Sequence, residues 1–72
     1  MTDFTITTKK ATYIVAELRE PNSNRTYDIM AVLEDNAPEM KMIDYMYGVS
    51  LMSEEEIMDN AQNIVSAYEE KR

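Results

Sequence analysis

The chain has 72 residues, with 14 acidic residues against 7 basic ones and a formal net charge of −7. It contains no cysteine and no histidine, which excludes disulfides, thiolate or imidazole catalysis and the common zinc sites. A chain of this length forms one domain with a small core, and its acidity disfavours direct binding to DNA or RNA because phosphate repels it.

Two runs of alternating apolar residues predict a β-hairpin. Apolar and other side chains alternate over 11–20, and the same period of two continues over 26–34. Between them, residues 21–24 (Pro-Asn-Ser-Asn) supply the chemistry of a tight turn. A third strand is expected beside the hairpin at 3–8.

A first helix is predicted after the hairpin, over 38–47. Pro38 suits the first turn of a helix, where its missing N–H costs nothing. Gly48 is a suitable residue to end the helix. Apolar residues recur between them at spacings of three and four, at Met40, Ile43, Met46 and Tyr47.

A second helix is predicted over 53–70. Ser53 and Glu56 have the spacing of a capping box. An apolar stripe follows at Ile57, Ala61, Ile64 and Tyr68. The predicted fold is therefore α+β: a single domain (1–72) with a small antiparallel meander or hairpin of two or three strands, followed by two α-helices.

One face of the predicted hairpin is too apolar to be left in water. Either one helix covers each face of the sheet, or this face binds a second copy or another partner. The residues of this possible dimer face are Tyr13, Val15, Met30 and Val32. Met42 and Tyr45 are further positions whose exposure would indicate adaptable binding.

Carboxylates are the remaining candidates for catalysis or metal binding. Adjacent Glu34 and Asp35 could form an acid–base pair, but no glycine-rich loop or nucleophile motif accompanies them. Residues 34–39 lack the ligand spacing and the glycine of a calcium loop, and the three glutamates at 54–56 point in different directions on a helix. We expect no enzyme, no cofactor and no metal site.

The negative charge is concentrated in the second part of the chain. Residues 1–27 hold three acids against four bases, a net +1, whereas residues 28–72 hold eleven acids against three bases, a net −8. Glu55 and Asp59 even form a like-charge pair four residues apart, which slightly destabilises a helix. The carboxylates along this helix and those near it in the sequence would form a row of negative charge. Such a row could enter a groove that binds nucleic acid, and long-range electrostatic attraction would steer it there.

In size, charge, acidic C-terminal part and strand-then-helix layout, the chain resembles the small, acidic, cysteine-free inhibitors that phages encode. The nearest of these are the anti-CRISPR proteins that block Cas9 by imitating DNA. The resemblance implies a stoichiometric inhibitor in the host cytoplasm, bound to the basic nucleic-acid-binding groove of a nuclease. The implied contact residues are Glu34, Asp35, Glu39, Asp44, Glu54, Glu55 and Asp59, with Tyr45 or Tyr47 stacking on arginine.

The alternative is a small homodimeric accessory or regulatory protein that uses its apolar sheet face as the interface. A weak similarity of residues 54–68 to the last helix of small antitoxin-like domains suggests one variant of this interpretation. The acidic side chains would then serve solubility. In both cases the first residues lack a signal-peptide pattern and the apolar runs at 13–16 and 29–33 are too short to cross a bilayer, so we expect a cytoplasmic protein.

Overall fold

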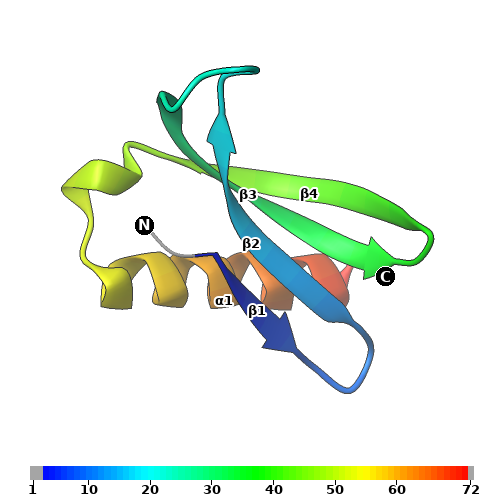
Figure 1. Cartoon of the computed structure of the whole chain (residues 1–72). Coiled ribbons are helices and arrows are strands. Elements are labelled where there is room, and N and C mark those ends of the chain that lie inside the picture. Colours follow the sequence, from blue (N-terminus) through cyan, green and yellow to red (C-terminus); the bar gives the residue numbers. More distant parts are fainter. Residues whose placement is uncertain (1–2, 72) are drawn as a thin grey trace.

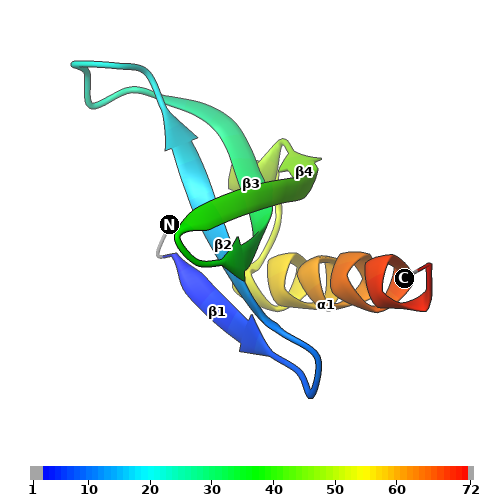
Figure 2. The same ribbon diagram turned by 90° about the vertical axis from the view of Figure 1, so that its right-hand side faces the viewer.

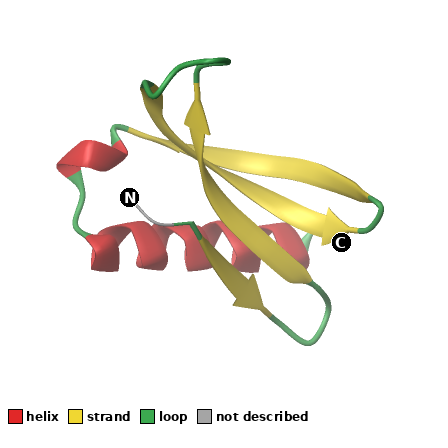
Figure 3. Ribbon diagram, viewed as in Figure 1, coloured by secondary structure: helices red, strands yellow, loops and turns green. Residues whose placement is uncertain are grey.

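The computed structural model describes residues 3–71 and contains a four-stranded antiparallel sheet, a short 3-10 turn and one long helix (Figures 1 and 3). The strands lie in the sheet in the order of the chain, β1-β2-β3-β4, so the sheet is a simple meander. The elements are β1 (Phe4–Thr7), β2 (Thr12–Arg19), β3 (Thr26–Asn36), β4 (Glu39–Tyr47), η1 (Val49–Leu51) and α1 (Glu54–Glu70).

The molecule has two layers, with α1 on one side of the sheet (Figure 2). Val15 of β2 pairs with Val32 of β3, and both side chains point toward α1. Ile57 and Val65 of α1 close the core from the other side. We call the face of the sheet that packs against α1 the inner face.

The four residues of the possible dimer face lie on this inner face. They are completely buried by the rest of the chain, so they form the core and offer nothing to a second copy: Tyr13, Val15, Met30 and Val32. The helix α1 covers this face, but the described residues contain no second helix on the opposite face, so the expected arrangement of one helix on each face is not observed.

The predicted helix over 38–47 is wrong, and with it the predicted pair of helices. Residues 39–47 form β4, which pairs with β3 along its whole length, from Asn36 opposite Glu39 to Ile29 opposite Tyr47. Pro38 lies in the turn between the two strands, where the Ala37–Pro38 peptide is cis. The fold is therefore four strands and one long helix.

A β-bulge explains why the sequence of β4 resembles a helix. Val32 pairs with Asp44, but the next residue, Leu33, pairs with Met42, so Ile43 is an extra residue in β4. A bulge breaks the period of two that marks a strand. Apolar residues on either side of it then fall at spacings of three and four, which is the helical pattern.

The end of β4 is fixed by a turn that a left-handed backbone makes possible. Gly48 has φ +64 and its N–H donates to the carbonyl of Asp28, at 2.9 Å. Asp28, itself at φ +58, accepts two hydrogen bonds from Ser50, one from the N–H at 2.8 Å and one from the hydroxyl at 2.9 Å. These bonds attach η1 to β3 and direct the chain beneath the sheet.

The last helix begins where its capping signal predicts. The Ser53 hydroxyl accepts a hydrogen bond from the N–H of Glu56, at 3.1 Å, and lies 3.4 Å from the Glu56 carboxylate. Ile57, Ala61 and Val65 are buried against the sheet. Within residues 3–71, no helix combines the length and the apolar character that crossing a membrane requires.

Replacing Ile57 with alanine tests how much the single helix contributes to stability. Ile57 is 1% exposed in the core between α1 and the sheet, so Ile57→Ala should lower the free energy of unfolding by about 2–5 kcal/mol. Its neighbour Met58 is 46% exposed, so Met58→Ala should change stability by less than about 0.5 kcal/mol. Urea unfolding followed by circular dichroism measures both, and equal effects would contradict this packing.

Candidate functional site

The face of the sheet opposite α1 is apolar, and no described element covers it. Side chains alternate between the two faces of a strand. Because Tyr13 and Val15 point inward, Ile14 points outward, and it pairs with Leu33. The apolar side chains on this outer face are Ile14, Ala16, Ile29, Ala31, Leu33, Met40, Met42, Tyr45 and Tyr47.

The outer face is most exposed along β4, which is an edge strand of the sheet. Met40, Met42 and Tyr45 are between 42% and 49% exposed, and Tyr47 is 66% exposed. The rings of Tyr45 and Tyr47 lie side by side, with their centroids 5.8 Å apart. Four large apolar side chains in a row are unusual on a monomer's surface and are typical of a protein-binding surface.

The outer face carries very little charge. In the rows that join β2, β3 and β4 over the described residues, Asp35 is the one charged residue at an outward position, and it lies next to the β3–β4 turn. The charged residues of β4 lie at positions that alternate to the inner side, at Glu39, Lys41 and Asp44. A chain with a net charge of −7 thus has one broad face that is almost neutral.

Glu34 does not belong to an acidic surface. Its carboxylate is on the inner face and 1% exposed. The Tyr68 hydroxyl donates to Oε1 at 2.9 Å, and the Asn36 amide donates to the same oxygen at 3.1 Å. A buried carboxylate is tolerated only where such donors replace water, so Glu34 has a structural role.

A second carboxylate ties the end of α1 to the first hairpin. Glu69 Oε2 accepts hydrogen bonds from the hydroxyls of Thr8, at 2.6 Å, and Tyr13, at 2.7 Å. The rings of Tyr13 and Tyr68 meet edge to face with centroids 6.3 Å apart. The two carboxylates and two tyrosines therefore fix the C-terminal end of α1 against the sheet.

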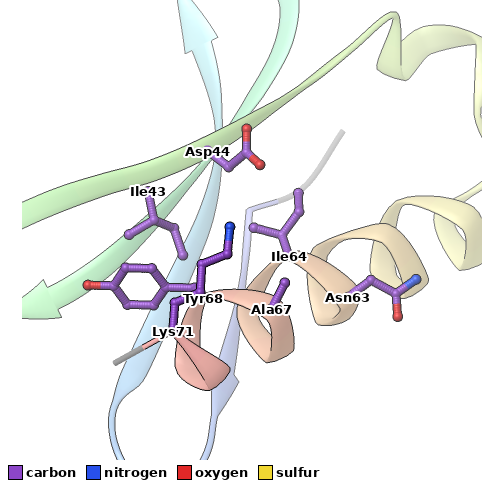
Figure 4. A pocket seen from close by; sticks show the side chains of 7 residues that line it. All are labelled: Ile43, Asp44, Asn63, Ile64, Ala67, Tyr68 and Lys71. Carbon is purple, nitrogen blue, oxygen red and sulfur yellow. The ribbon is translucent and has the colours of Figure 1, made fainter.

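A shallow groove of about 330 Å³ runs between β4 and α1 (Figure 4). Its apolar lining comes from Ile43, Ile64 and Ala67, with Tyr68 at one end. Asp44 and Lys71 lie at its polar rim. The groove is an open depression, whereas small-molecule sites enclose most of the surface of their ligand.

The acidic residues that the sequence groups together are spread over the molecule. Asp35 and Glu39 flank the β3–β4 turn, whereas Glu54, Glu55 and Asp59 are exposed on the first half of α1, at the opposite end of the molecule (Figure 1). Asp44 lines the groove. Within residues 3–71, no three acidic side chains gather closely enough to hold a metal ion.

The start of α1 is the part of the molecule with the densest exposed negative charge. Glu54, Glu55, Glu56 and Asp59 are all exposed, and none of them makes an ion pair with the described residues. Helix α1 itself contains no lysine or arginine. Tyr45 and Tyr47 lie on the outer face, on the other side of the sheet from α1, so the tyrosines and these acids do not form one surface.

Comparisons with protein-family models, with curated proteins and with solved structures each give no match.

Removing one hydroxyl tests the structural role of Glu34. Tyr68→Phe deletes a donor to a buried carboxylate oxygen, and it should lower the free energy of unfolding by about 1–3 kcal/mol. Tyr47→Phe removes a hydroxyl from a side chain that is 66% exposed and should leave stability unchanged. Thermal unfolding of the two variants beside wild type measures this difference, and a Tyr68→Phe variant as stable as wild type would refute the role.

Proposed function

We propose that this protein acts without catalysis, as a small accessory or regulatory protein that binds another protein through the outer face of its sheet. One observation carries the proposal: a face that includes Met40, Met42, Tyr45 and Tyr47 is exposed and nearly uncharged. Burying such side chains against a partner gains about 25 cal/mol for each Å² of apolar surface removed from water. Aromatic residues and methionine are also enriched at the cores of protein interfaces.

The chemistry of the other surfaces gives less support to a catalytic function. The carboxylates of the buried Glu34 and the half-buried Glu69 accept hydrogen bonds from tyrosine hydroxyls. The groove beside them is shallow and has an apolar lining. A binding function requires neither a reactive carboxylate nor an enclosed pocket.

Charged substitutions on β4 test the outer face as a binding surface. Met42→Lys and Tyr45→Lys place a cation where an apolar partner would pack, and each should reduce the amount of bound partner at least tenfold. The measurement is chemical cross-linking in cells followed by quantification of the captured proteins, each normalised to the amount of bait. Gln62→Lys, which makes the same addition of charge on the exposed side of α1, is the matched control. Capture that all three variants reduce equally, or that none reduces, would count against the proposal.

A second candidate function is the one that the resemblance suggests, a stoichiometric inhibitor of a nucleic-acid enzyme of the Cas9 type. The observation in its favour is the start of α1, where Glu54, Glu55 and Asp59 are exposed and have no cationic neighbour in ion-pair contact among residues 3–71. A basic groove could accept these carboxylates in place of phosphates. Glu34 takes no part, since it is buried.

Charge reversal on α1 tests this second function. In a competition assay, the protein should displace labelled duplex DNA from a Cas9-type nuclease, less effectively as the salt concentration rises. Glu55→Lys with Asp59→Lys should abolish the displacement. The control is the single substitution Glu70→Lys, because it reverses a charge at the far end of the same helix and leaves the carboxylates at its start unchanged. Absence of displacement by the wild type, or full displacement by the double variant, would reject an inhibitor of this kind.

A further inference from the structure

We infer that the outer face joins two copies of this chain, sheet against sheet, with the two α1 helices on the outside of the dimer. This inference rests on the proposed function and deepens it by naming the partner as a second copy. It differs from the dimer that the sequence suggests, because that one used Tyr13, Val15, Met30 and Val32, which are buried beneath α1.

The dimensions of the molecule leave room for a dimer interface on the outer face. The molecule measures 34 × 28 × 17 Å along its principal axes, and the thin direction is the one expected for a single sheet with one helix layer. The 34 × 28 Å extents of the broad side are an upper limit for the outer face and leave room for the roughly 800 Å² per partner of a standard protein interface. The apolar side chains of the outer face are of the kind that homodimer interfaces contain, since these are more apolar than interfaces between proteins that meet transiently.

The distribution of charge favours a second copy over a basic partner. Two molecules that each carry a net charge of −7 repel one another. They can therefore pack closely only through a surface that carries almost no charge. The outer face is such a surface, with Asp35 at its margin. A basic protein, by contrast, is attracted to the exposed carboxylates of α1 and gains no electrostatic energy at the outer face.

The shape of the outer face also suits two-fold symmetry. One row across the sheet contains Ala16 of β2, Ala31 of β3 and Tyr45 of β4, so small side chains lie beside a large one. With a two-fold axis along the strands, the ridge formed by Met42, Tyr45 and Tyr47 in one copy lies over β1 and β2 of its partner. Each copy supplies one ridge and one low region, as an isologous interface requires.

The first experiment measures the mass of the protein in solution by sedimentation and light scattering across the micromolar range. The wild type should be a dimer, and Ala16→Arg or Met42→Arg should raise the dissociation constant at least a hundredfold and give monomers. Met42 is 42% exposed on an edge strand, so its variant tests the interface even if the Ala16 variant fails to fold. Gln62→Arg on α1 is the matched control and should remain dimeric.

The second experiment uses the absence of cysteine from this chain. A single cysteine introduced as Ala16→Cys should allow a short bis-maleimide reagent to link two chains, because position 16 faces the partner. Gln62→Cys, on the outside of the proposed dimer, should give no linked product at the same protein concentration.

These outcomes separate the inference from the function on which it rests. A wild type that stays monomeric up to high micromolar concentration overturns the dimer. So does a dimer that survives both arginine substitutions, or one that is linked through position 62 and not through position 16. If the protein is monomeric while Met42→Lys still reduces capture of other proteins in cells, binding through the outer face stands and the second copy is the wrong partner.

Discussion

Strands β2 and β3 are apolar on both faces, but residues 3–71 supply a single α-helix to cover them. This imbalance determines the arrangement of the rest of the molecule. Helix α1 covers the face with Tyr13, Val15 and Val32, and in its last turn the Glu69 carboxylate accepts hydrogen bonds from the hydroxyls of Thr8 and Tyr13. The opposite face keeps Ile14, Leu33 and the side chains of β4 without a cover from the described residues. A sheet with a helix on one side has one face covered, whereas an α/β sheet has helices on both faces.

Local signals in the sequence were sufficient for β2, β3 and the last helix. Alternation marks β2 and β3, and Ser53 with Glu56 marks the start of α1, because capping chemistry depends on residues close together in the chain. The helix predicted over 38–47 is wrong, because the extra residue in β4 at Ile43 depends on pairing with β3. A bulge is a property of two strands, and single-strand periodicity does not contain it.

The candidate surfaces were harder to predict than the elements. The acidic count correctly located the excess charge in the second part of the chain, yet Glu34 is buried beneath Tyr68. Alternation with Met30 and Val32 places Glu34 on the inner face, but one of its two donors, Tyr68, lies 34 residues away and is brought to it by the packing of α1. The sequence predicts the need for a cover on the face with Tyr13, Val15, Met30 and Val32, which α1 covers. The exposed outward row on β4 follows from the pairing of residues 39–47 with β3, which the sequence does not predict.

The two candidate functions use separate surfaces, so they are compatible in one molecule. Sheet-to-sheet pairing leaves α1 on the outside of each copy, with Glu54, Glu55 and Asp59 still in solvent. A dimer would then present two acidic helix ends. Doubling the acidic ends raises the effective concentration of one end once the other has bound. Substitutions on β4 and substitutions on α1 therefore affect different steps, assembly in the first case and attraction to a basic partner in the second.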